Sequence, residues 1–154
     1  MNEIKELAPG ESLEWLRMRR ALFPDCSTTM HDCEVAEIRA HPDRHAVLVY
    51  QRDEAANRLG GFVEVSIRDR VDGSLSGPVG YVEGWYVDPD LRGGGIGRAL
   101  LEAAERWASE RGLSELASDC ELNNSSALAA HQALGFRETF RLVHLLKPLV
   151  PKSP

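Results

Sequence analysis

A glycine-rich turn between a predicted strand and a predicted helix is the clearest candidate for a ligand-binding site in this sequence. The turn spans residues 92–97 (Arg-Gly-Gly-Gly-Ile-Gly), between a predicted strand over 80–88 and a predicted helix over 98–111. Glycines let the backbone approach a ligand closely, and the N–H groups at the start of a helix point toward an anion, which the helix dipole also favours. The turn therefore predicts a site for a phosphate-bearing cofactor.

The spacing of the glycines separates the known phosphate-binding motifs. The P-loop requires Gly-Lys-Ser/Thr, and the sequence contains no such tripeptide. The dinucleotide fingerprint requires a glycine where Arg98 stands, and it follows the first strand of a βαβ unit, whereas this turn lies past the middle of the chain. The spacing that fits is R-x-x-G-x-G, with Arg92, Gly95 and Gly97. The alternative is a glycine-rich turn that binds no ligand.

This spacing resembles the pyrophosphate loop of the GNAT superfamily of N-acetyltransferases, which binds acetyl-CoA. Residues 81–89 are similar to the central strand of that superfamily, and residues 123–136 to its asparagine-led helix that ends in Gly-Phe. The three motifs occur in the superfamily's order, and each constrains a different element. The resemblance implies a mixed α/β fold, in which helices flank a central mixed β-sheet with two splayed parallel strands.

Within the superfamily, the sequence is most similar to the aminoglycoside 6'-N-acetyltransferases. The likeness covers most of the chain and is carried by residues 19–24, 66–68, 82–84, 117–119 and 131–136. It implies direct transfer of acetyl from acetyl-CoA to the 6'-amine of an aminoglycoside in a ternary complex, and a homodimeric enzyme of antibiotic resistance. Two alternatives remain open: an acetyltransferase of another amine, such as a polyamine or a protein N-terminus, and a non-catalytic sensor of acyl-CoA.

The resemblance also assigns the cofactor contacts. The pantetheine arm would enter between the strands over 80–88 and 114–120, and backbone amides of the turn would hold the pyrophosphate. Arg92 is either a phosphate clamp or a solvated loop cation, and Asn124 is either a hydrogen-bond partner of the cofactor or a helix N-cap. The predicted cofactor-binding residues are Trp85, Tyr86, Val87, Arg92, Gly93, Gly94, Gly95, Ile96, Gly97, Arg98 and Asn124.

Glu83 and His131 are the predicted catalytic residues. Alkylamines are protonated at neutral pH, so acetyl transfer needs a base, and a carboxylate in a central strand can take the proton directly or through water. Strict alternation would place Glu83 on the same face as Trp85. The alternative for Glu83 is a salt-bridged structural residue. His131 stands where much of the superfamily carries a tyrosine, and it either protonates the leaving thiolate or packs against the pantetheine arm.

Acidic residues near the predicted site favour a cationic acceptor. The net charge of −6 argues against nucleic acid as a partner and suits a cationic substrate. Asp119 ends the strand next to the central one, where it would bind a second ammonium or cap the following helix. Phe23 would lie against a sugar ring. The predicted substrate-binding residues are Phe23, Glu83, Asp119 and Glu138.

Length and composition indicate one enzyme domain. The 154 residues fit a single N-acetyltransferase domain over 1–147, followed by a loose, proline-containing tail over 148–154. No apolar run reaches membrane-spanning length and no signal peptide begins the chain, so we expect no membrane association. Three scattered cysteines suggest neither a disulfide framework nor a metal site, and they favour the reducing cytoplasm.

Periodicity predicts the remaining elements. The helices are expected over 12–23, 31–40, 98–111 and 124–134, and the strands over 4–7, 46–51, 61–68, 80–88, 114–120 and 137–147. The last strand is too apolar for a solvated edge. We therefore expect it to contribute to a homodimer interface, with Glu138 near a shared rim of the acceptor site.

Overall fold

A computed structural model describes residues 3–150 of the chain. Its helices are α1 (Ser12–Leu22), α2 (Thr28–Ala40), α3 (Ile96–Glu110) and α4 (Ser125–Ala133), with short 3-10 turns η1 (Pro9–Glu11) and η2 (Pro89–Leu91). Its strands are β1 (Ile4–Glu6), β2 (His45–Asp53), β3 (Arg58–Arg68), β4 (Val79–Val87) and β5 (Leu116–Ser118). The predicted mixed α/β class is confirmed, and every expected element but one is present.

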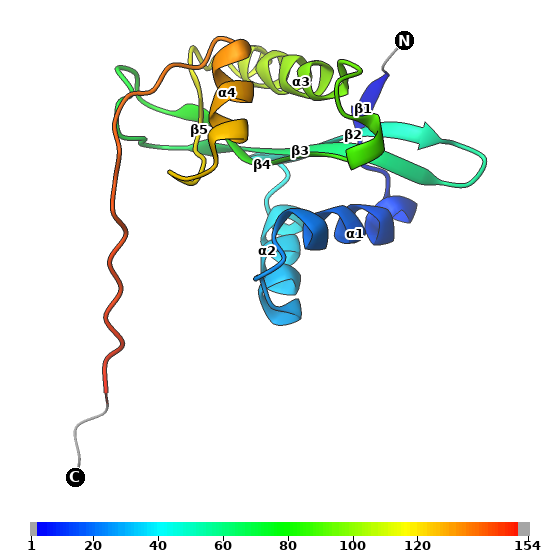
Figure 1. The fold of residues 1–154 in the computed structure, drawn as a ribbon, viewed down its shortest axis with the longest axis horizontal. Helices are drawn as coiled ribbons and strands as arrows, with labels where there is room; N and C mark the ends of the chain where they lie inside the picture. The colour runs from blue at the N-terminus through cyan, green and yellow to red at the C-terminus, as the bar shows by residue number, and fades with distance from the viewer. Residues whose placement is uncertain (1–2, 151–154) are drawn as a thin grey trace.

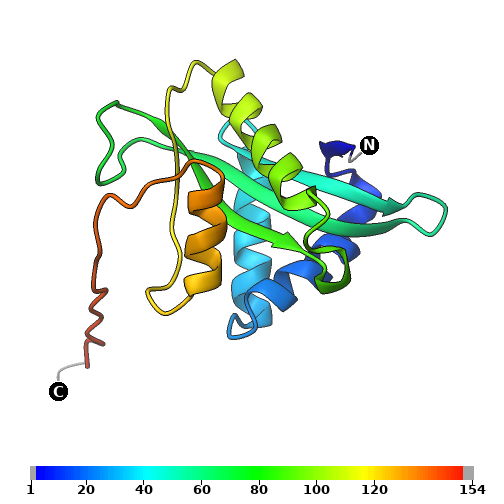
Figure 2. The same ribbon diagram turned by 45° about the horizontal axis from the view of Figure 1, so that its top comes forward.

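The strands form one mixed sheet in sequence order, β1-β2-β3-β4-β5. Neighbouring strands are antiparallel from β1 to β4, whereas β5 runs parallel to β4 after the crossover through α3. Helices α1 and α2 cover one face of the sheet, and α3 and α4 cover the other (Figures 1 and 2). The sheet is therefore the middle layer, and residues that alternate along β3 and β4 point toward different helices.

Each face of the sheet has its own hydrophobic core. On the α3 face, Leu100, Ala104 and Trp107 pack with strand residues that include Val65 and Val82. The other face buries a second cluster against α1, made up of Trp15, Met18, Val47, Val49, Leu59, Phe62 and Tyr86. Helix α3 follows the predicted spacing because its apolar side chains lie along one face, toward the sheet.

Helix starts and strand lengths differ from the sequence-based boundaries where a local hydrogen bond decides them. Helix α2 begins at Thr28 because Ser27 accepts a hydrogen bond from the Met30 N–H, which is an N-cap interaction. Ser12 is the first residue of α1, and its hydroxyl donates to the Pro9 carbonyl. β5 is shorter than expected, because its pairing with β4 ends at Ser118.

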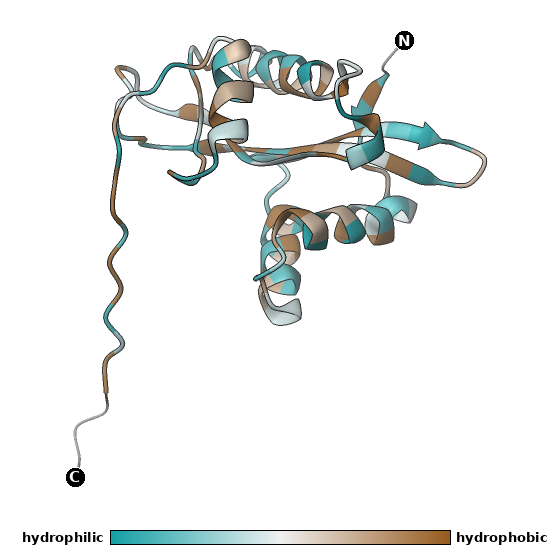
Figure 3. Ribbon diagram, viewed as in Figure 1, coloured by the Kyte–Doolittle hydropathy of each residue, from teal (hydrophilic) through white to brown (hydrophobic). Residues whose placement is uncertain are grey.

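The predicted final strand over Arg137–Lys147 is wrong for the single chain. Residues 137–150 contain no helix or strand. Thr139 lies against Gly73 in the loop between β3 and β4, and beyond it the segment leads away from the rest of the molecule (Figure 1). Short apolar and polar stretches follow one another along this segment (Figure 3), yet a strand exists only where its backbone pairs with a neighbour. The large apolar side chains here are solvent-exposed: Phe140, Leu142, Val143, Leu145, Leu146, Leu149 and Val150.

A buried ion pair joins α1 to the sheet. Arg19 is 1% exposed, and it donates hydrogen bonds to Glu64 of β3 and to Glu34 of α2. The indole of Trp15 donates to the same Glu64 carboxylate at 2.9 Å. Burial raises the pKa of Glu64, and Arg19 opposes that shift by stabilising the charged form. The pair fixes the α1–α2 layer against the strands that carry the site.

We predict that Arg19→Met destabilises the fold by about 3–5 kcal/mol, because it leaves the buried Glu64 carboxylate without its cation. The double variant with Glu64→Met should lose much less, since both charges are then gone. Urea unfolding followed by circular dichroism measures both values. Arg39→Met is the control, because Arg39 bonds the exposed Ser12 hydroxyl. Equal losses in the Arg19 and Arg39 variants would contradict the structural role of the pair.

Candidate active site

The sheet opens into a fork between β4 and the edge strand β5, where the pairing of these two strands stops. β4 and β5 pair at Gly80↔Leu116, Tyr81↔Ala117 and Val82↔Ser118, and the pairing ends there. β4 continues to Val87, and within residues 3–150 no strand pairs with its last part on the β5 side, because β5 ends at Ser118. The fork therefore leaves a backbone edge along residues 83–87, and such an edge can accept an added extended chain.

The two predicted acceptor-site carboxylates lie where β4 and β5 separate. Glu83 directly follows Val82 on β4, and Asp119 directly follows Ser118 on β5. Tyr81 links the two strands, because its hydroxyl donates a hydrogen bond to Asp119. Burial, followed by this hydrogen bond, raises the pKa of Tyr81, so the phenol stays a donor. The structure thus brings Glu83 and Asp119 to the same point of the sheet.

Glu83 lies on the opposite face from the one that strict alternation predicted. The β3–β4 register shifts between Glu64 and Val65, so Glu64 opposes Gly84 while Val65 opposes Val82, and Glu83 is the extra residue of a β-bulge. A bulge re-aims the side chain that it inserts. Glu83 therefore shares the α1–α2 face with Tyr86, whereas Trp85 packs in the α3 core.

The Glu83 carboxylate is anchored to β3. The Ser66 hydroxyl donates to Oε1 at 2.7 Å, and Arg68 donates to Oε1 from Nε at 2.9 Å and to Oε2 from Nη2 at 2.7 Å. The Arg68 guanidinium also lies 3.5 Å from the centroid of the Tyr81 ring. The side chain of Glu83 is 31% exposed, so the carboxylate is fixed and still accessible.

The glycine turn has the geometry of an anion site. Gly93 and Gly95 have φ angles of 83° and 85°, in the left-handed region that glycine adopts without strain. Gly95 is the N-cap of α3 and supplies no side-chain hydrogen bond to the first turn. A Cβ on Gly97 would lie 3.2 Å from Trp85 Cζ2, so the helix start packs closely on β4. These residues fit a pyrophosphate held by backbone donors.

Arg92 points back to the central strand. Its Nε donates to the Val87 carbonyl at 2.9 Å, and its guanidinium carbon lies 5.7 Å from the centroid of the Tyr86 ring. Neither contact involves the backbone amides of the turn. Arg92 thus holds the end of β4 in place, which the sequence-based alternatives of phosphate clamp and solvated cation did not include.

His131 of α4 faces the fork from the α3–α4 side. Its Nδ1 donates to the Ala127 carbonyl at 2.6 Å, which assigns Nε2, 2.8 Å from the Ser118 hydroxyl, as an acceptor in the neutral ring. The ring meets Trp85 and Phe136 edge-on, with centroids 5.2 and 5.3 Å away. These contacts agree with a packing role, and they leave the imidazole next to the last paired residue of β5.

The end of α4 explains the spacing of the His-x-x-x-Gly-Phe motif. The Gly135 N–H bonds to the Gln132 carbonyl, and the Phe136 N–H bonds to the His131 carbonyl, which together form a Schellman motif. Gly135 has a φ of 93°, as the motif requires. The same geometry places the Phe136 ring on the His131 ring. The other end of α4 is capped by Asn124, whose Oδ1 accepts from the Ala127 N–H at 3.1 Å.

Of the two remaining predicted substrate-site residues, Phe23 lies near Glu83 and Asp119, whereas Glu138 does not. Phe23 lies at the fork, because a Cβ on Gly84 would come within 3.4 Å of the Phe23 ring. Glu138 does not join the other carboxylates in the single chain, since it lies in the extended C-terminal segment and pairs with Arg141. The side chains of Ser66, Arg68, Tyr81 and Ser118 were not predicted. The alternation of Glu64, Ser66 and Arg68 along one strand face was the available signal.

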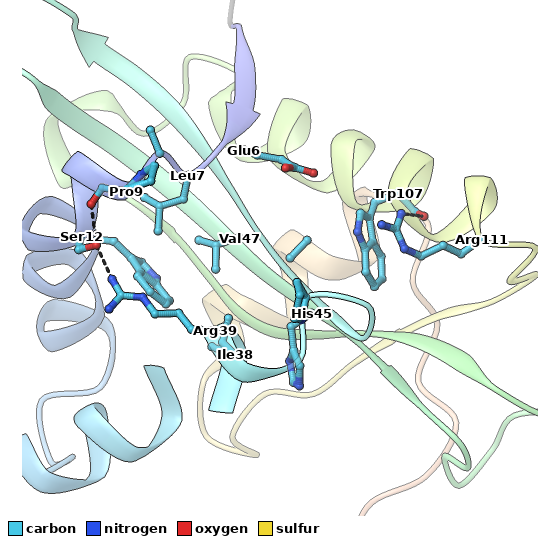
Figure 4. Close-up of a pocket in the computed structure, with 14 residues that line it drawn as sticks. Glu6, Leu7, Pro9, Ser12, Ile38, Arg39, His45, Val47, Trp107 and Arg111 are labelled. Atoms are coloured by element: carbon cyan, nitrogen blue, oxygen red, sulfur yellow. Dashed lines mark hydrogen bonds between the residues drawn. The ribbon is translucent and has the colours of Figure 1, made fainter. Parts of the chain in front are cut away.

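Two other features lie away from this fork. A hollow of about 480 Å³ lies along β1, the start of β2, α1, α2 and α3, and it includes none of the predicted site residues (Figure 4). Cys26, His31 and Glu34 bring potential metal ligands within 4.8 Å of one another. Arg19 already bonds to both His31 and Glu34, so the positive charge there comes from the chain itself.

Comparison with known proteins identifies relatives over almost the whole chain. The Acetyltransferase (GNAT) family matches residues 11–136. The aminoglycoside N(6')-acetyltransferase type 1 of Stenotrophomonas maltophilia is 38% identical over 97% of this chain and 95% of its own. The Klebsiella aerogenes protein of that name is 40% identical over 95% and 96% of the two chains.

Solved structures agree with this relationship. AAC(6')-Iy, in complex with the bisubstrate analogue CoA-S-monomethyl-acetylneamine, superposes with a TM-score of 0.87 at 31% identity, over 97% of this chain and 99% of its own. AAC(6')-IG from Acinetobacter haemolyticus superposes with a TM-score of 0.86 at 33% identity, over 96% and 99% of the two chains. Among residues 3–150, no helix is long and apolar enough to cross a membrane.

We predict that acetyl-CoA at 100 times its Kd stabilises the protein by about 2.7 kcal/mol, and that Gly93→Asp abolishes this gain. The new carboxylate would lie in the anion site. Gly112→Asp is a matched control, because Gly112 also has a positive φ of 75° and open space around it, but it lies beyond the other end of α3. Thermal melts with and without acetyl-CoA give the answer. Equal ligand responses in the two variants would rule out the turn as the phosphate site.

Proposed function

The chain belongs to the GNAT acetyltransferase family, and we propose that it transfers the acetyl group of acetyl-CoA to the 6'-amine of aminoglycosides. The observation that supports this most directly is the fork. The glycine turn, Trp85 and His131 lie on the α3–α4 face, while Glu83 and Asp119 lie on the α1–α2 face. A thioester and an amine that approach from opposite faces can meet only where the sheet is open.

Glu83 acts on the acceptor amine. The ammonium form has no lone pair, so the amine must lose a proton before it attacks the thioester carbon. An ionised carboxylate accepts that proton directly or through one water, and it also attracts the ammonium beforehand. The attack forms the new C–N bond. The nitrogen then loses its extra proton and the C–S bond breaks, so that CoA leaves as a thiolate whose charge that proton neutralises. The alternative role, a purely structural ion pair, is the one that substitution tests.

Asp119, Phe23 and His131 act around this step. Asp119 is exposed and provides a second anionic contact for a polycation, while Phe23 provides an apolar surface beside Gly84. His131 and Ser118 lie on the cofactor side of the fork, where they can pack against the pantetheine arm or donate to the departing sulfur. The amide of Asn124 keeps its N–H donors available to the cofactor, because its oxygen serves as the cap.

Turnover on a panel of acceptors tests the function. We expect release of free CoA with aminoglycosides that carry a 6'-amine, and little release with polyamines or peptides. Glu83→Gln should lower kcat on aminoglycosides by about 10²- to 10⁴-fold while acetyl-CoA still stabilises the fold. Glu102→Gln, on the outer side of α3, is the control for the lost charge. Near-native turnover of Glu83→Gln across pH would reject its role as base, and turnover confined to polyamines would reject the acceptor.

We further propose that the protein works as a homodimer built through residues 137–150. Leu145 and Leu146 are 90% and 95% exposed in the single chain, in a segment whose large apolar side chains are all classed as exposed. β5 is an edge of the sheet, next to the fork. The segment of a second copy can add to that edge and bury its apolar residues, and it would carry Glu138 toward the acceptor site.

The three cysteines are free thiols, which suits a reducing cytoplasm.

Light scattering at micromolar concentration should give twice the 17.1 kDa chain mass. Replacing both Leu145 and Leu146 by Asp should shift the mass to that of one chain, because two carboxylates cannot be buried at an interface. The double variant of Leu75 and Leu122 to Asp is the control, since these leucines are 95% and 72% exposed in loops. A mass near 17.1 kDa for the native protein, unchanged by concentration, would exclude the dimer.

A further inference from the structure

Arg68 engages Glu83 more completely than an ordinary surface ion pair. A carboxylate has about four lone-pair positions for hydrogen bonds. Both positions on Oε1 are taken, by Ser66 and by Arg68 Nε, and Arg68 Nη2 takes one on Oε2. One acceptor position on Oε2 therefore remains for a substrate or a water. The carboxylate is thereby held in one orientation, and a ligand can bond to it only at this remaining position.

The Arg68 guanidinium is itself held in place from the other side. It stacks on the Tyr81 ring at 3.5 Å, and Tyr81 is 6% exposed and bonded through its hydroxyl to Asp119. Asp119, Tyr81, Arg68 and Glu83 thus form a continuous series of contacts across the fork. A lysine ammonium can also lie over an aromatic ring, but it cannot donate the two-point hydrogen bond to Glu83 while a flat group stacks on Tyr81.

Exposure separates this ion pair from the structural one on the same strand face. Arg19 and Glu64 are 1% and 5% exposed at their side chains, whereas Arg68 and Glu83 are 44% and 31% exposed. An exposed pair contributes little to stability, about 0–1 kcal/mol. The elaborate anchoring of Glu83 is therefore not needed to hold the fold together.

We propose that Arg68 is the positioning residue of Glu83: it fixes the carboxylate so that its one open acceptor position faces the amine at the fork. This inference rests on the role of Glu83 proposed above. Arg68 does not bind the acceptor, which is a polycation that it would repel. Its effect on the reaction passes through Glu83 alone, and this sets it apart both from a substrate contact and from a structural ion pair.

The kinetic test compares Arg68→Gln, Arg68→Lys and a control, Arg44→Gln. Arg44 is 41% exposed and pairs with Asp69. Its substitution therefore removes the same charge as Arg68→Gln without touching Glu83. We expect Arg68→Gln to lower kcat on an aminoglycoside by about 10- to 100-fold, because a small displacement of a catalytic group has effects of that size. KM should stay the same or fall, since a repelling cation is lost. Arg68→Lys should recover only part of kcat, and Arg44→Gln should keep native kcat.

A double-variant cycle decides whether Arg68 acts through Glu83. In a Glu83→Gln background, Arg68→Gln should change kcat by less than about twofold, because the group that it positions is already gone. Additive losses, a raised KM with native kcat, or native kcat in Arg68→Gln would each overturn the proposal. Melting temperatures of all variants should lie close to the native value, as expected for an exposed pair.

A measurement without substrate keeps this proposal separate from the proposed function. In protein labelled with ¹³C at the glutamate carboxyl, the Glu83 signal is identified by its absence in Glu83→Gln. Arg68→Gln should shift that signal, and Arg44→Gln should leave it in place. If the native protein acetylates no aminoglycoside, the proposed function fails while this spectrum still reports on the pair. An unmoved Glu83 signal in Arg68→Gln would show that Arg68 does not position the carboxylate.

Discussion

The pairing of β4 with β5 stops after Val82 and Ser118, and the rest of the site depends on this stop. A continuous sheet would separate its two helical layers completely. Along 83–87, the β5 side of β4 has no neighbouring strand within residues 3–150, and the Val87 carbonyl accepts a hydrogen bond from the Arg92 side chain instead. The same stop makes Glu83 and Asp119 the first residues beyond the paired region.

The bulge at Glu83 decides toward which face of the sheet its carboxylate points. Without the extra residue, Glu83 would share a face with Trp85 and point into the α3 core. With it, the carboxylate reaches Ser66 and Arg68 on the face of α1 and α2. The proposed cofactor elements and the proposed acceptor carboxylates thereby occupy opposite faces of one sheet. Neighbouring residues of one strand can then serve two ligands that have to react with each other.

Arginines on β3 and α1 balance the acidic residues of this face in two different ways. Arg19 and Glu64 are buried beneath α1, where an unpaired charge would destabilise the folded state, so this pair has a structural role. Arg68 and Glu83 keep contact with solvent, so their pairing orients a carboxylate and leaves it accessible. The apolar segment after Phe136 has no such balance within one chain. Its exposed leucines and valines are the basis of the proposed dimer.

Sequence patterns alone determined the order of the elements up to residue 136 and the geometry of the glycine turn, and the family resemblance that they carry implied the fold class. These features follow from local information: the period of apolar residues, glycines at positions of positive φ, and Asn124 at the start of a helix. Glu83, Asp119 and Phe23 could also be placed near one site, since the resemblance fixed their positions along known elements. The contacts of Arg92 and Glu138, in contrast, were not predictable from their spacing.

Tertiary structure decided what depends on register and on distant partners. The face of Glu83 follows from a one-residue bulge, which sequence alternation cannot reveal, because the shift exists only relative to β3. Arg68 and Tyr81 became part of the site only once β3 and β4 were aligned. The segment over 137–147 has the composition of a strand, yet it forms none in the single chain. A strand requires a partner for its backbone, and the identity of that partner is not written in the segment itself.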